Sequence, residues 1–138
     1  MVPEGKPIQR SLLMQAWSGI AFWMALGLLL EGLLAFKSPA YLLDAQRREL
    51  FRLAHTHGVL LNLLLCAAAL CGRQRPAPAS ANWCLRMGAI LMPVGFLAAG
   101  IAHPEGDPGL AIWLVPPAAL LVIFGAVSTA LSWRAERN

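Results

Sequence analysis

Four long runs of apolar residues, separated by short polar segments, dominate the hydrophobic pattern of the chain. A helix needs roughly 20 mostly apolar residues to cross a bilayer core about 30 Å thick, and each run is about that long. We therefore predict an all-α fold, an integral membrane bundle of four transmembrane helices that forms a single domain over residues 1–138. The predicted spans are 12–36, 50–71, 83–102 and 110–133.

Composition supports this class. Hydrophobic residues make up 58% of the 138 residues and charged residues only 13%, whereas about 25% of a soluble domain is charged. The first span is longer than the apolar region of a cleaved signal, and it contains Glu31. The lipid bilayer is thus the first expected partner, and we expect no nucleic-acid partner.

The distribution of basic residues predicts the orientation. Short cytoplasmic loops carry an excess of Lys and Arg. Seven basic residues lie on the side of the two tails and of the connection between the second and third spans, if Arg86 just inside the third span is included. Four lie on the side of the other two connections. The seven are Lys6, Arg10, Arg73, Arg75, Arg86, Arg134 and Arg137, and the four are Lys37, Arg47, Arg48 and Arg52. We expect both termini to be cytoplasmic, in a bacterial inner membrane.

Local signals refine the helix boundaries. Asp44 is a residue type that caps helix N-termini, and Pro39 marks the break after the first span. Pro93 lies in the middle of the third span, and Pro116 and Pro117 lie within the fourth. A proline removes a backbone donor and tends to kink a helix, so these residues either shape the bundle or form a gate.

Ionisable residues inside the spans are the candidate site. An Asp or a basic residue at the centre of a membrane helix costs at least about 2.5–3.5 kcal/mol on insertion scales, so such residues are functional candidates. Glu31 lies near the outer end of the first span, His55 and His57 near the outer end of the second, and His103 at the end of the third. Because successive spans alternate in direction, we expect all four residues in one layer. Glu105 and Asp107 follow as a solvated acidic turn.

Helical periodicity separates the two histidines of the second span. Residues about 3.6 positions apart share a helix face. Arg48, Arg52, His55, Asn62 and Cys66 therefore form one stripe, which we expect to face the interior of the bundle. His57 lies about 200° round a regular helix from His55. The two imidazoles either serve two partners or converge through a distortion at Gly58.

Metal chemistry fits these residue types, because imidazole and carboxylate bind copper, zinc and iron ions and imidazole is an axial ligand of haem. We predict His55 and His57 as metal ligands, with Glu31 and His103 as ligands or supporting partners. Arg48, Arg52 and Asn62 are the predicted cofactor-binding residues; the arginines would hold a haem propionate, an anionic quinone or a lipid headgroup, or would simply extend to the membrane interface. A Glu–His pair also suits proton transfer or quinol binding, and a structural network in which Glu31 pairs with Arg52 or a histidine is the alternative.

The segment "AHTHG", Ala54–Gly58, resembles the Ala-His-x-His pattern in membrane helices of the haem–copper oxidase and nitric oxide reductase superfamily. In that superfamily the His-x-His pair serves two redox centres on opposite sides of one helix, so the resemblance implies a haem- or metal-carrying relative. This chain departs from the superfamily's catalytic subunit, which has many more spans and further histidines for copper. The stretch "YLLDAQRRELFRLAHTHG" also resembles a group of small bacterial four-span membrane proteins, which implies no particular activity.

These observations predict a small membrane protein that binds a metal ion or haem through histidines in the outer leaflet, for electron transfer or small redox chemistry. No residue is assigned a catalytic role. One alternative is a non-catalytic accessory subunit of a larger membrane complex, with other subunits or a second copy as partners. The other is a small proton-coupled transporter or channel, although the spans show no internal repeat.

Overall fold

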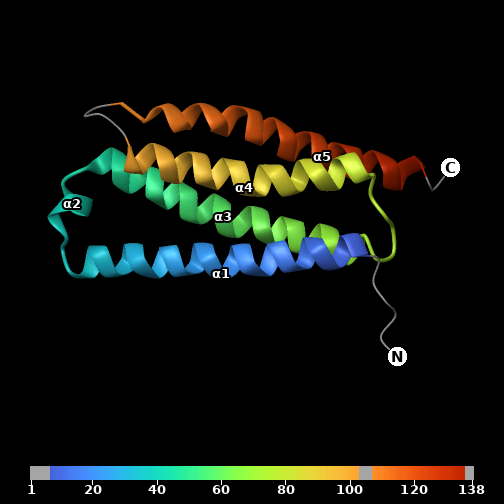
Figure 1. Ribbon diagram of the computed structural model, residues 1–138, viewed down its shortest axis with the longest axis horizontal. Helices are drawn as coiled ribbons and strands as arrows, with labels where there is room; N and C mark the ends of the chain where they lie inside the picture. The colour runs from blue at the N-terminus through green and yellow to red at the C-terminus, as the bar shows by residue number, and fades with distance from the viewer. Residues whose placement is uncertain (1–6, 103–106, 136–138) are drawn as a thin grey trace.

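The structure is a computed structural model that describes residues 7–102 and 107–135. Its elements are α1 (Pro7–Ala35), α2 (Pro39–Leu42), α3 (Ala45–Cys71), α4 (Ala79–Ile101), the 3₁₀ segment η1 (Leu110–Leu114) and α5 (Val115–Ala135). The start of α1 and the end of α5 lie at one end of the molecule, and α2 closes the other end (Figure 1). We call these the terminal end and the distal end.

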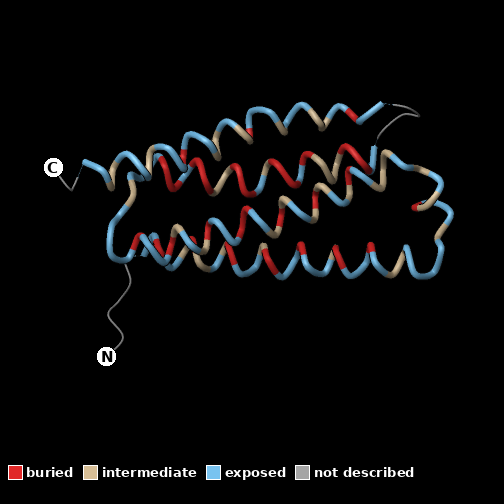
Figure 2. The backbone as a smooth tube through the Cα atoms, turned by 180° about the vertical axis from the view of Figure 1, so that it is seen from behind, coloured by how far each residue is buried: buried red, intermediate tan, exposed pale blue. Residues whose placement is uncertain are grey.

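The four long helices form a row rather than a closed ring. Each packs mainly against its neighbour in the chain, α1 on α3, α3 on α4 and α4 on α5. All four, with η1 counted as part of the last, are long and apolar enough to cross a bilayer. The predicted all-α membrane bundle of four helices is confirmed, and these helices indicate an integral membrane protein. Because the row is open, α1 and α5 lie at its edges and each has a long exposed face (Figure 2).

The fourth span lies where it was predicted, but it is not α-helical from its start. Residues 110–114 form a 3₁₀ segment, and α5 begins only at Val115, so Pro116 and Pro117 occupy its first turn. The backbone N–H groups of a first turn have no partner within the helix, and proline is tolerated there. These two residues therefore do not interrupt a helix. Pro93, in contrast, lies inside α4 as predicted, where it is buried while the helix continues past it.

Small residues set the spacing between α4 and α5. A Cβ at Gly88 would overlap the side chain of Val122, and a Cβ at Gly95 would lie 3.1 Å from that of Val115. Small residues let membrane helices approach closely and gain van der Waals contact. The α4–α5 contact depends on this fit, since α5 buries only Ala118 and Gly125.

Asp44 caps α3, as its residue type predicts. Its Oδ1 accepts a hydrogen bond from the backbone N–H of Arg47 at 2.8 Å. We expect Asp44→Ala to lower the free energy of unfolding by about 1 kcal/mol, the usual value of an N-cap. Asp44→Asn keeps an acceptor and should lose less than half as much. Denaturant unfolding in detergent, followed by circular dichroism, measures both; equal losses would assign the effect to the charge of Asp44 instead of the cap.

Candidate functional site

Three side chains cross between α1 and α3, and each lies against a glycine of the other helix. Trp23 of α1 covers Gly58, while His55 and Asn62 of α3 cover Gly27 and Gly19. A Cβ at any of these glycines would overlap the side chain that lies over it. The glycines thus create the space in which His55 is held.

His55 has one fixed nitrogen and one available nitrogen. Its Nδ1 lies 2.7 Å from the backbone oxygen of Trp23. Because a carbonyl oxygen only accepts hydrogen bonds, Nδ1 carries the hydrogen in this contact, and in the neutral imidazole Nε2 then has a lone pair. Nε2 makes no hydrogen bond with any residue that the structure describes. The half-buried ring therefore presents an acceptor or a metal ligand in a fixed orientation.

A cavity of about 700 Å³ lies beside this imidazole, towards the distal end of α1 and α3. Most of its wall is apolar, and its polar groups are Glu31 of α1, Tyr41 of α2, and Arg52 and His55 of α3. The apolar remainder comes from α1, namely Met24, Ala25, Gly27, Leu28, Leu30 and Leu34. The expectation that Glu31 and His55 lie in one layer is confirmed, and both line one cavity.

The charged residues around the cavity pair differently from the predicted network. Arg52 lies 3.3 Å from Glu49, one turn earlier on α3, and both side chains are mostly exposed. Glu31 forms no ion pair or hydrogen bond with any residue in the described part of the chain. In the described part of the chain, Glu31 therefore pairs with neither Arg52, His55 nor His57. Its carboxylate remains available to whatever occupies the cavity.

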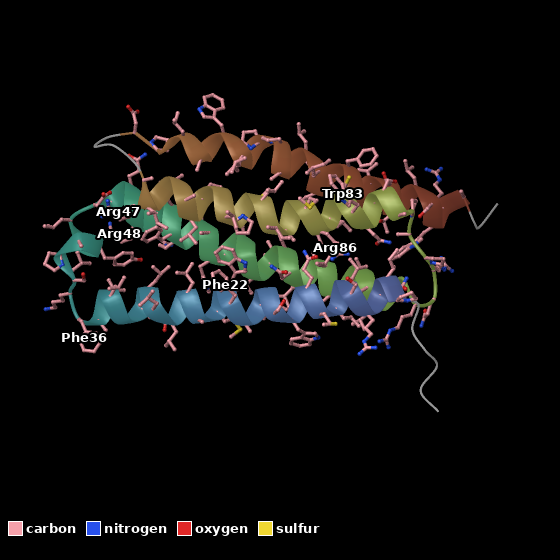
Figure 3. The ribbon with its side chains drawn as sticks, viewed as in Figure 1. Phe22, Phe36, Arg47, Arg48, Trp83 and Arg86 are labelled. Atoms are coloured by element: carbon pink, nitrogen blue, oxygen red, sulfur yellow. The ribbon has the colours of Figure 1, made fainter. Side chains whose placement is uncertain are left out.

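Arg48 and Asn62 lie outside this cavity. Arg48 donates to the backbone oxygen of Leu42 at 3.0 Å, which places it at the distal end beside Arg47 (Figure 3). Asn62 is only 3% exposed and donates to the backbone oxygen of Gly58 at 2.7 Å. The predicted polar stripe on α3 is thus divided: Asn62 is buried against α1, whereas Arg52 is largely exposed.

His57 points to the other side of α3, away from His55. Its Nδ1 lies 2.9 Å from the backbone oxygen of Leu53, and its ring centroid is 5.1 Å from that of Phe96 on α4. The helix runs without interruption through Gly58. Of the two arrangements predicted for the histidines, the structure has the one with two separate partners, so one metal ion cannot bind both.

Within the described residues, no group of three or more His, Cys, Asp and Glu side chains is arranged to hold a metal ion. His103 and Glu105 lie outside the described residues, so the predicted role of His103 has no structural counterpart here. Asp107 is exposed, as expected for a solvated turn.

Two residues near the site were not singled out from the sequence. Tyr41 is the only tyrosine of the chain and is 5% exposed, because α2 folds back over the distal end of α1 and α3. Trp23 supplies the carbonyl that orients His55. Tyr41 could have been noticed in the sequence as an aromatic residue two positions after Pro39. The Trp23 carbonyl could not, because a backbone acceptor leaves no pattern in the sequence.

Comparison of the chain with models of protein families, with curated proteins and with solved structures gives no match. The assignment of function therefore depends on the residues of the cavity.

Proposed function

We propose that the protein binds a quinol or quinone in the cavity between α1 and α3 and takes part in electron transfer at the membrane. The observation that carries this proposal is the His55 imidazole, whose Nδ1 is fixed on the Trp23 carbonyl while Nε2 is available beside the cavity. With the cytoplasmic termini that the basic residues favour, the cavity lies in the outer half of the bilayer.

The polar groups of the cavity suit both redox forms of such a ligand, and its apolar wall suits the ring and tail. A quinol hydroxyl donates a hydrogen bond and releases its proton on oxidation, and His55 Nε2 and the Glu31 carboxylate are both acceptors. Arg52 and Tyr41 supply donors for the carbonyl oxygens of the quinone form. The apolar wall from α1 suits the ring and its lipid tail. A volume of about 700 Å³ is within the usual range for a ligand pocket.

Haem is the second candidate, favoured by the fixed tautomer of His55. Imidazoles that bind metals commonly donate their other N–H to a carbonyl or carboxylate, as His55 does here. A haem needs only one or two axial ligands from the protein. A bare zinc, copper or iron ion needs three or more protein ligands, and His55 and Glu31 alone do not provide them.

An accessory role in a larger complex is compatible with either ligand. Glu31 is exposed on α1, at the edge of the row, and an ionisable side chain in a span normally faces protein or water. A second subunit on this edge would cover it. In that case the chain would be one subunit of a complex, and the ligand would bind to this chain within the complex.

The test is the ligand content of the protein purified in mild detergent. We expect about one quinone per chain after solvent extraction and no Soret band. Ala25→Phe, which places a ring in the cavity, should remove most of the quinone, whereas Ala21→Phe, one turn earlier on the exposed part of α1, should not. A Soret band lost in the same variant would favour haem, and a protein that retains neither ligand would contradict the proposal.

A further inference from the structure

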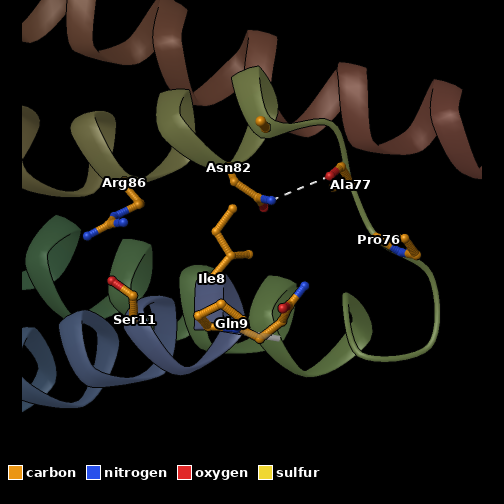
Figure 4. Close-up of a pocket in the computed structure, with 9 residues that line it drawn as sticks. Ile8, Gln9, Ser11, Pro76, Ala77, Asn82 and Arg86 are labelled. Carbon is orange, nitrogen blue, oxygen red and sulfur yellow. Dashed lines mark hydrogen bonds between the residues drawn. The ribbon is translucent and has the colours of Figure 1, made fainter. Parts of the chain in front are cut away.

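A second cavity, of about 560 Å³, lies at the terminal end of the molecule. The first turns of α1, the start of α4 and the connection between α3 and α4 surround it (Figure 4). It shares no residue with the cavity beside His55. Its polar side chains are Gln9, Ser11, Asn82 and Arg86, and no carboxylate is among the described residues that line it.

Arg86 is the charged group of this cavity. It lies about two turns inside α4 and is half-buried. Its Nε donates to Oε1 of Gln15 at 2.7 Å, and Nε2 of Gln15 donates to the backbone oxygen of Arg86 at 3.1 Å. This reciprocal contact fixes one edge of the guanidinium. Among the residues that the structure describes, no carboxylate pairs with Arg86, so its positive charge within the span lacks a counterion.

Gln9 leaves an acceptor unpaired in the wall. The residue is 3% exposed, and its Nε2 donates to the backbone oxygen of Gly72 at 3.2 Å. Because a carbonyl cannot face another oxygen acceptor, this contact fixes the orientation of the amide. Oε1 of Gln9 is buried, and no described residue donates to it. A buried acceptor without a partner costs free energy, so a hydroxyl group that reached Oε1 from the cavity would remove this cost.

The rest of the cavity adds donors and apolar surface. Asn82 makes one long contact, 3.5 Å from its Nδ2 to the backbone oxygen of Ala77, and the Ser11 hydroxyl lies on the facing side of α1. Ile8 and Pro76 contribute apolar wall. Exposed Arg10, Arg73 and Arg75 surround this end and raise its positive potential.

We infer that this cavity binds the headgroup of an anionic phospholipid. The Arg86 guanidinium, with Ser11 and Asn82, binds the phosphate, and a headgroup hydroxyl of the glycerol type donates to Gln9. Basic pockets between membrane helices are typical sites for anionic headgroups. A lipid fits better than a free anion, because the arginine lies within the span and the cavity has apolar walls.

The test is native mass spectrometry of the full chain with phosphatidylglycerol and phosphatidylcholine of identical acyl chains. We expect a preference for phosphatidylglycerol that Arg86→Gln lowers by about tenfold or more, because charge-assisted hydrogen bonds are lost. Arg10→Gln removes the same charge at the same end from a residue outside the cavity. It should lower the preference by no more than about fivefold, the effect of a surface charge alone.

Three results would overturn the inference: equal retention of the two lipids, equal losses in the two arginine variants, or glycerol 3-phosphate bound as tightly as the lipid. If Arg86→Gln does not fold, Asn82→Leu fills the cavity while keeping the charge of Arg86. Asn82→Leu should also lose the preference for phosphatidylglycerol. If this variant kept the preference, the result would equally contradict the site.

Discussion

Replacing Gly58 with leucine is expected to lower the free energy of unfolding by roughly 3 kcal/mol, the upper end of the usual cost of overpacking. A Cβ at Gly58 would overlap the part of the Trp23 indole nearest its backbone, which cannot move away without shifting the helix. Trp23 is only 4% exposed. The added side chain therefore forces α1 and α3 apart and disturbs the site of His55.

Gly32→Leu is the matched control, because no described atom beyond its chain neighbours and the nearby backbone of its own helix lies within 4 Å of a Cβ placed there. It should be neutral or stabilise α1 by up to about 1 kcal/mol, since glycine is a poor helix former. Denaturant unfolding of both variants in one detergent gives the comparison. Similar stabilities of the two variants would mean that α1 and α3 do not pack through Trp23 and Gly58.

His55→Phe is expected to weaken quinone binding by about tenfold or more, whereas His57→Phe should leave the affinity within about twofold of wild type. One buried hydrogen bond is worth about 0.5–1.5 kcal/mol, and leaving its partner unsatisfied costs more. Phenylalanine keeps a ring over Gly27 but has no nitrogen, so packing is largely preserved. His57 faces Phe96 on the other side of α3. Titration of each variant with a short-chain quinone measures both affinities.

The two histidine variants also distinguish the proposals. An equal loss of quinone affinity in both variants would indicate a general effect on α3. A loss of affinity in His57→Phe alone would mean that the quinone binds on the side of α3 that faces α4. Loss of a Soret band in His55→Phe, in place of quinone, would support the haem alternative.

Helical periodicity and hydropathy predicted much of this molecule. The four apolar runs have the length of membrane spans, and the Asp44 cap follows from residue type. The opposite directions of His55 and His57 follow from their spacing on a regular helix. These features are local, or depend only on how spans alternate in direction.

Other features depend on contacts between distant segments, which spacing alone does not reveal. Arg52 pairs with Glu49 of its own helix and not with Glu31 across the cavity, and only the arrangement of α1 and α3 decides between the two carboxylates. The burial of Asn62 depends on Gly19, a glycine on another helix. Tyr41 joins the cavity only because α2 folds back. Pro116 and Pro117 lie within the fourth span as predicted, but hydropathy does not reveal that a 3₁₀ segment precedes them and puts them in the first turn of α5.

The central claim, that Nε2 of His55 meets the redox ligand, is tested most directly by pulsed electron paramagnetic resonance on protein labelled with ¹⁵N-histidine. With the bound quinone reduced to its semiquinone, we predict magnetic coupling to one histidine nitrogen that disappears in His55→Phe and persists in His57→Phe. A semiquinone without histidine coupling, or a coupling that survives in His55→Phe, would contradict the claim.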